Sequence, residues 1–245
     1  MATSSTFSGA FTASAGTLSA LIDRCQVFLN DESDSTWDTE MIGTFLNDAI
    51  RDYSQHFPRV RTAAIDLSTG SNAYNLPEDI LGIVSVEYPA GEDPPQYLRR
   101  KDYTAVCFWS DEQLYDIVRN RDDANVDELW LSADPNTGET AVIYYNAYHQ
   151  LIADPSTPGG SNTVPEEHQQ LLVKYVNWQA SLHLAFAEQQ FPTSNSSLLM
   201  AQLAQNARRN ELSYHTALQQ AIYAAEGLSK YTHWATSGSG VGRIY

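Results

Sequence analysis

Apolar side chains recur at helical spacing in two segments near the start of the chain. The second stripe runs from Ile42 to Phe57. Asp38 fits its N-cap, Trp37 can pack on Ile42 as a hydrophobic staple, and Pro58 stops the helix. The first stripe occupies residues 17–30, has Thr17 or Gly16 near its start, and contains Leu18, Leu21, Ile22, Cys25, Phe28 and Leu29. We therefore predict an antiparallel helical hairpin over residues 17–58, closed by an acidic turn.

The apolar period changes to two after this hairpin, which predicts a β insertion over residues 59–150. Val84 and Val86, for example, alternate with Ser85 and Glu87. The clearest expected hairpin joins residues 128–133 to 139–145 through the turn Asp134–Gly138. Residues 142–145 are apolar on both faces, so we expect the core on one side of that strand and a helix or a neighbouring subunit on the other.

Two long helices are predicted after a Pro/Gly/Ser linker at residues 154–162, and together they make the core segment 163–227. Pro165, Glu166 and Glu167 give first-turn signals for the first helix. The second follows Pro192, and Gly227 is its candidate C-cap. The expected fold is α+β: mainly an antiparallel bundle of about four helices, with an inserted antiparallel β-sheet and extended N- and C-terminal arms.

Both ends of the sequence are low in complexity but carry large apolar side chains. Residues 1–16 are expected to form an N-terminal arm and residues 228–245 a C-terminal docking tail. The candidate docking residues of these two ends are Phe7, Phe11, Tyr231, His233, Trp234, Ile244 and Tyr245.

Charge restricts the possible partners. The chain has 30 acidic residues against 14 Lys and Arg, a formal charge of −16, and residues 87–139 hold 13 acids and 5 bases. Such a surface repels phosphate, so sequence-specific nucleic-acid binding is disfavoured, and a solvated acidic face is the ordinary interpretation. A stacking platform for single strands near the tail would need more cations than Lys230 and Arg243. We see no membrane helix and no secretion signal, so we expect a soluble protein, with Cys25 and Cys107 reduced.

Motifs for catalysis or cofactors are missing, and the six histidines lack ligand spacing. Asp123, Asn125 and Asp127 open like a calcium loop with Asp134 at its twelfth position, but Glu128 stands where the sharp turn needs glycine. Glu166 and Glu167 fit a helix start better than an acid–base pair. We therefore expect no catalytic, cofactor-binding or metal-binding residues, and no enzyme.

Several segments resemble the head-to-tail connector (adaptor) proteins of tailed phages. In residues 17–61 the likeness lies in the order helix, acidic turn Asp31–Asp34, Trp37, and Leu46-Asn47-Asp48 within the second helix. Later segments look like the inserted sheet and following helix of larger members; they read LPEDILGIVSVEYP (76–89), ELWLSADPNTGETAVIYYNAYH (128–149) and VPEEHQQLLVKYVNWQAS (164–181). The likeness spans about residues 17–190, and the part from Phe191 onward is not specific to the family.

The resemblance implies a homo-oligomeric ring, commonly of twelve copies, between the portal protein and a tail or nozzle protein. The C-terminal extension would grip the portal, and genomic DNA would pass through the lumen without sequence-specific binding. The protein would be assembled in the host cytoplasm and lie at the head–tail junction of the virion. A tail terminator or stopper ring is the nearer alternative. A carbohydrate-binding or hydrolytic tail domain, with Trp109 and Trp130 in a sugar cleft, is the more distant one.

Overall fold

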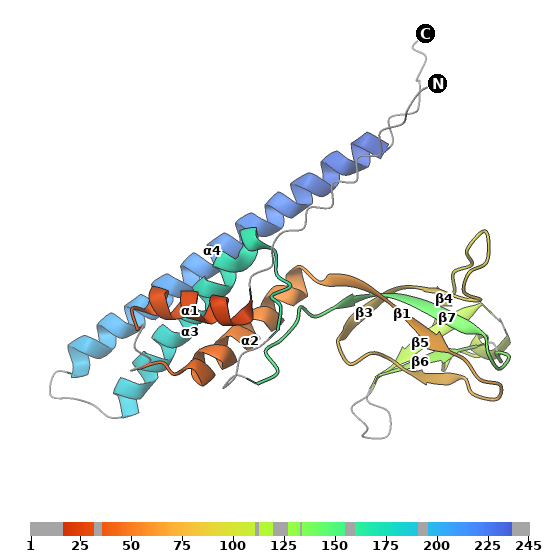
Figure 1. Ribbon diagram of the computed structural model, residues 1–245, viewed down its shortest axis with the longest axis horizontal. Coiled ribbons are helices and arrows are strands. Elements are labelled where there is room, and N and C mark those ends of the chain that lie inside the picture. Colours follow the sequence, from red (N-terminus) through yellow and green to blue (C-terminus); the bar gives the residue numbers. More distant parts are fainter. Residues whose placement is uncertain are drawn as a thin grey trace, which may run out of the picture. The chain divides into compact units, whose positions relative to one another are not determined.

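A computed structural model of the chain describes residues 17–31, 36–110, 113–119, 127–132, 134–154, 160–190 and 196–236. The chain forms two compact units (Figure 1). The helical unit combines residues 1–56 with 150–245, and the β unit comprises residues 57–149. Four α-helices and two sheets confirm the α+β class with about four helices.

The predicted helical hairpin is present with the caps that the sequence indicated. Helix α1 spans Leu18–Leu29, and the Thr17 hydroxyl accepts a hydrogen bond from the Ala20 amide at 3.2 Å. Helix α2 spans Thr39–His56, and the Asp38 carboxylate accepts from the Met41 amide at 2.7 Å. Each cap satisfies an amide that a helix start otherwise leaves unpaired.

The turn between α1 and α2 is held by a buried acid. Asp31 is 6% exposed, and its carboxylate accepts hydrogen bonds from the backbone amides of Thr36 at 2.7 Å and Trp37 at 2.6 Å. The Trp37 ring is buried and makes edge contacts with Phe45 and His183. In the acidic turn, Asp31 therefore has a structural role, because its carboxylate binds the backbone that leads into α2.

Helix α3, Gln169–Gln190, is the centre of the helical unit and contacts the other three helices. Its apolar residues are not confined to one face at its start, where the consecutive residues Leu171, Leu172 and Val173 are all buried. A helix with neighbours on several sides needs apolar residues all round. A 3₁₀ turn, Glu166–His168, precedes α3, in agreement with the helix-start interpretation of the paired acids.

Helix α4 spans Ser196–Thr236 and does not end at Gly227 as the sequence had suggested. One interior glycine costs a helix only about 1 kcal/mol, and no proline follows to break it. Residues 228–236, expected to belong to the C-terminal docking tail, are helical. Figure 1 shows α4 lying along α3 and continuing past its end.

Two sheets make up the β unit where one was expected. The first is antiparallel with the order β1-β7-β3, and the second has the order β2-β6-β5-β4 with β4 and β5 parallel. Their bounds are Arg59–Asp66 (β1), Ala73–Asn75 (β2), Ile80–Glu87 (β3), Arg99–Arg100 (β4), Leu114–Val118 (β5), Glu128–Leu131 (β6) and Thr140–Ala147 (β7). A shared core includes Val86, Leu129, Leu131 and Ile143.

The hairpin predicted between β6 and β7 is wrong. Strand β6 pairs with β2 and β5, whereas β7 pairs with β1 and β3, so the intervening turn carries the chain from one sheet to the other. That turn is fixed by the loop between β1 and β2: Thr137 hydrogen-bonds Thr69, and the Asp134 carboxylate accepts from the Gly70 amide at 3.0 Å. Turn-forming residues mark a change of direction but do not choose the partner strand.

Candidate interaction surfaces

Among the α4 residues whose side chains the structure describes, the buried ones lie on one face. These buried residues are Ala207, Tyr214 and Leu218, and Tyr214 stacks on Trp178 of α3 with ring centroids 6.0 Å apart. The Tyr214 hydroxyl donates a hydrogen bond to the carboxylate of Asp52 on α2. Burial, the hydrogen bond and the charge of Asp52 all raise the pKa of Tyr214. Three helices are thus tied together around this side chain.

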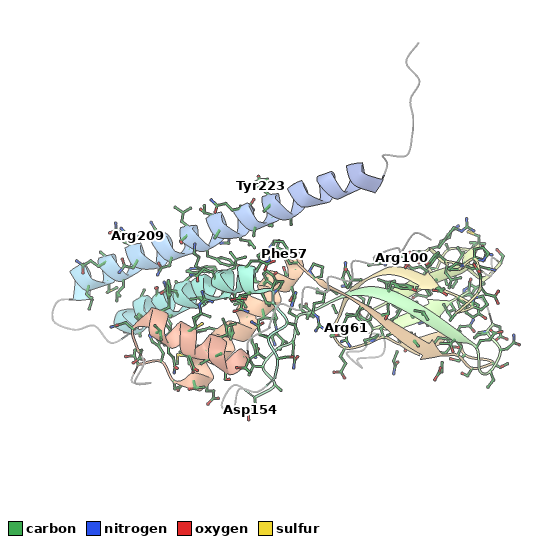
Figure 2. The ribbon with its side chains drawn as sticks, turned by 45° about the horizontal axis from the view of Figure 1, so that its top comes forward. Phe57, Arg61, Arg100, Asp154, Arg209 and Tyr223 are labelled. Atoms are coloured by element: carbon green, nitrogen blue, oxygen red, sulfur yellow. The ribbon has the colours of Figure 1, made fainter. Side chains whose placement is uncertain are left out.

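The other faces of α4 expose apolar side chains. Leu212 is 68% exposed and Tyr223 is 67% exposed. Figure 2 shows Tyr223 on the outer side of α4, away from α3. Leu212 lies in a shallow groove of about 350 Å³ that α4 forms with α3, and Lys174, Arg209, Ser213, Thr216, Ala217 and Gln220 complete its lining.

A second groove of about 400 Å³ lies between α3 and α4. Phe186 in it is 57% exposed. Its lining is mostly apolar and consists of Trp178, Leu182, Ala185, Phe186, Met200, Ala204, Ala207, Arg208 and Glu211. Exposed apolar grooves of this kind are typical of protein-binding surfaces rather than of a solvated face.

Charge is distributed unevenly between these helices and the rest of the chain. Residues 169–245 contain 3 acids and 5 Lys or Arg, whereas the chain as a whole has 30 acids and 14 Lys or Arg. Helix α4 itself contains the acids Glu211 and Glu226 in 41 residues. Acidic copies of one chain repel each other, so their contacts are favoured where the acids are few.

The three-stranded sheet offers a further surface, one with few charges. Side chains of β7 alternate, with Ala141, Ile143, Tyr145 and Ala147 in the core and the others half-buried on the opposite face. That opposite face, here called the outer sheet face, consists of Val60, Thr62, Ala64, Asp66, Gly82, Ser85, Glu87, Thr140, Val142, Tyr144 and Asn146. The expected core on one side of β7 is confirmed, and cover on the outer face stays a prediction.

Aromatic side chains also gather on the four-stranded sheet, where the sequence suggested a sugar cleft. The ring centroids of Trp109 and Trp130 lie 6.0 Å apart, and the ring centroid of Tyr103 lies 5.1 Å from that of Trp130. The acid beside them, Asp116, accepts hydrogen bonds from the Tyr103 amide at 3.0 Å and Arg100 at 3.5 Å. Trp130 donates to Glu128 at 2.9 Å. These acids support the aromatic cluster, so the geometry does not favour a hydrolytic pair.

The acids of the candidate calcium loop have separate partners in the structure. Asp127 pairs with Arg119 at 3.7 Å, and Asp134 binds the Gly70 amide. Asp123 and Asn125 lie outside the described residues. Over the residues that the structure describes, no group of three His, Cys, Asp or Glu side chains could hold a metal ion.

Three of the predicted docking residues lie at the end of α4, and the other four lie outside the described residues. Phe7, Phe11, Ile244 and Tyr245 fall outside the described residues. Tyr231, His233 and Trp234 lie on the last turns of α4, of which the structure describes the backbone. The sequence analysis missed Leu212, Phe186 and Tyr223, although the scarcity of acids after residue 169 is a signal that could have directed attention to α3 and α4.

In the described parts of the chain, no helix is both long enough and apolar enough to cross a membrane. Cys25 is buried and Cys107 is exposed. Burial raises the pKa of the Cys25 thiol to about 12.

A helical scaffold with a β insertion and several exposed apolar, charge-poor surfaces defines a protein built for contacts with other proteins. A model of the SU10 adaptor protein family matches residues 16–227, and the chain belongs to this family. This membership confirms the resemblance to phage head-to-tail adaptors and makes the chain a phage adaptor protein. The match extends past Phe191 and so includes most of α4. No curated protein matches the chain.

Proposed function

We propose that this phage adaptor joins the capsid to the tail. In this proposal identical copies form a ring under the portal protein, twelve in number as the resemblance implies, and a tail or nozzle protein binds the opposite side. The protein lies at the head–tail junction of the virion, contributes to the DNA channel and has no enzymatic role. Membership of the SU10 adaptor protein family over residues 16–227 supports the general assignment.

The observation that carries the proposal is the charge-poor surface of α3 and α4. Because the chain carries a formal charge of −16, bringing copies together is electrostatically unfavourable. Residues 169–245 contain 3 acids and 5 bases, so they do not contribute to this repulsion. They also expose the apolar side chains of Phe186, Leu212 and Tyr223. Contacts between copies and with the portal are therefore best placed on these helices.

Acidic residues suit the passage of DNA. A wall rich in carboxylates offers phosphates few cations to bind, so DNA can slide past without adhering. The β unit holds the segment 87–139, with its 13 acids and 5 bases. We propose that part of this surplus faces the lumen and that the protein binds genomic DNA without sequence specificity.

The C-terminal segment is proposed as the portal anchor. Its aromatic residues Tyr231, His233 and Trp234 lie on the last turns of α4, and Ile244 and Tyr245 follow. A long helix can carry such anchors away from the body of the unit, since each residue adds about 1.5 Å of length. Phe7 and Phe11 are the corresponding anchors proposed for the N-terminal arm.

The test is complementation of an adaptor-deficient phage with two truncated chains. One chain stops after Gly227 and loses the helical turns with Tyr231 and Trp234, and its matched control stops after Thr236 and keeps them. We expect heads that lose DNA and lack tails with the first chain, and partial or full assembly with the second. Full DNA retention and tail joining without residues 228–245 would contradict portal anchoring. Binding of the purified chain to tails but not to portal would assign the terminator role.

A further inference from the structure

Strand β1 presents a long open edge. Its eight residues, Arg59–Asp66, pair with β7 from end to end without a register shift. On its other side no residue that the structure describes pairs with it. In an edge strand about half of the backbone N–H and C=O groups point outward, ready to pair with a further strand.

The opposite edge of the same sheet, β3, is closed by comparison. Its pairing with β7 shifts register twice, which indicates bulges. A neighbouring segment also covers it: the Leu98 amide donates to the Val86 carbonyl at 2.8 Å, and the Tyr88 amide donates to the Gln96 carbonyl at 3.0 Å. Bulges and covering segments are the usual protection of sheet edges, and β1 has neither.

One face of β1 is suited to an uncharged partner. Val60, which is 72% exposed, lies on the outer sheet face with Thr62 and Ala64, and the charge of β1 on this face is the acid Asp66 at the end of the strand. The charge of Arg61 belongs to the other face, where its guanidinium pairs with Asp79 at 2.5 Å. Arg61 is marked on β1 in Figure 2. An added strand could therefore lay apolar side chains beside Val60 and Ala64 without meeting a cation.

Residues 1–16 have the composition that this edge requires. In a chain with 44 acidic, Lys and Arg residues, they contain none, and they consist mainly of Ser, Thr, Ala and Gly. Phe7 and Phe11 are four residues apart, so a strand would place both on one face. Val60 and Ala64 have the same spacing on the outer sheet face, which allows two cross-strand pairs at once.

The segment is also long enough to supply a strand that matches β1. Thr17 is fixed by its bridge with Ser161 and by its cap on α1, so residues 1–16 extend from a defined point. Extended chain covers about 3.3–3.6 Å per residue, or roughly 50 Å for the whole segment. Pairing along eight residues leaves about half of that length as a connection.

We infer that the open edge of β1 accepts residues 1–16 of a second copy of this chain as an added strand, with Phe7 and Phe11 on the outer sheet face. The inference rests on the proposed function, because a ring holds a neighbour within reach of every copy. Each copy would then be linked to the next by backbone hydrogen bonds to the β unit, in addition to contacts of α3 and α4. The added strand would extend the outer sheet face at its edge, with Phe7 and Phe11 beside Val60 and Ala64.

Disulfide cross-linking in virions tests this pairing between copies. All chains carry Cys107→Ser, so that the exposed native thiol does not interfere. One chain also carries Phe7→Cys or Phe11→Cys, and a second, co-expressed chain carries Val60→Cys. Mild oxidation of purified virions should give a dimer on a non-reducing gel, since the cysteines stand on different chains. Val60 is 72% exposed, so its replacement leaves the fold intact.

The matched control replaces Val60→Cys by Val106→Cys. Val106 is an equally large residue of the β unit and is 99% exposed, but it lies outside β1. A dimer with Val60→Cys and not with Val106→Cys supports the inference. Two results would overturn it: no dimer, or an equal yield from the control. The proposed function fails separately, because the adaptor chain would then be absent from virions.

Discussion

The hydroxyl of Tyr214 on α4 donates a hydrogen bond to the carboxylate of Asp52 on α2. Tyr214 is 2% exposed, so its hydroxyl depends on this partner. Replacing Tyr214 by Phe should lower the free energy of unfolding by about 1–2 kcal/mol, since a buried hydrogen bond to a charged group is lost. Urea denaturation measures the change. Tyr223→Phe, at a position 67% exposed, is the control and should change stability by less than about 0.5 kcal/mol.

The same side chain predicts a loss of stability in alkali. The pKa values of Tyr214 and Tyr53 are raised above 10, in both cases mainly by burial. A raised folded pKa means that the stabilisation is complete below the unfolded value of about 10 and is lost as the pH rises above it. The wild-type chain should therefore lose stability from about pH 10 upward, and Tyr214→Phe should lose less. Parallel stability curves for the two proteins above pH 10 would refute the assignment.

The side chain of Asn47, within the Leu46-Asn47-Asp48 segment, forms two hydrogen bonds with the backbone of Ile152. Its side-chain amide donates to the Ile152 carbonyl at 3.0 Å, and its oxygen accepts from the Ile152 amide at 2.8 Å. Asn47→Asp should destabilise the chain by about 2–3 kcal/mol at pH 7, because a carboxylate then faces a carbonyl oxygen. Relative to wild type at each pH, it should recover in acid, when the protonated carboxyl can donate. Asn47→Ala should show no recovery in the same denaturation series.

The two thiols should differ in reactivity. Cys107 is exposed, whereas burial raises the pKa of Cys25 to about 12 and removes it from solvent. At pH 8 an alkylating reagent should modify one thiol per folded chain quickly, and Cys107→Ser should abolish that fast reaction. Cys25 should react only when denaturant unfolds α1. Mass spectrometry counts the modified sites, and two fast sites in the folded chain would contradict the burial of Cys25.

Local signals explain why the sequence predicted the helical hairpin well. Thr17 and Asp38 cap helices that follow them directly, and Pro58 ends α2 nearby. The information lies within a few residues of each boundary. The hydrogen bonds between Asn47 and Ile152, by contrast, join residues 105 positions apart, and no local pattern indicates them.

Strand pairing and the interaction surfaces were harder for the same reason. The partners of β7 lie in β1 and β3, more than 50 residues away, so the adjacent β6 was the natural but wrong choice. On α4 the apolar residues at helical spacing, among them Ala207, Tyr214 and Leu218, form the buried face. Leu212 and Tyr223, which are exposed, lie off that face and need the structure to be recognised.

The substitution Gly227→Ala tests where α4 ends. Gly227 lies inside the helix, and nothing lies near the position that an added Cβ would take, so Gly227→Ala should stabilise the chain by up to about 1 kcal/mol. A helix ending there in the left-handed conformation would instead be destabilised by alanine. Gly160 is the contrast: its φ is +101°, and an added Cβ would lie 2.8 Å from Nε2 of Gln150. Gly160→Ala should therefore destabilise the chain by about 1 kcal/mol or more. Thermal unfolding of both variants decides the matter, since a lower Tm for Gly227→Ala would show that α4 stops short of Thr236.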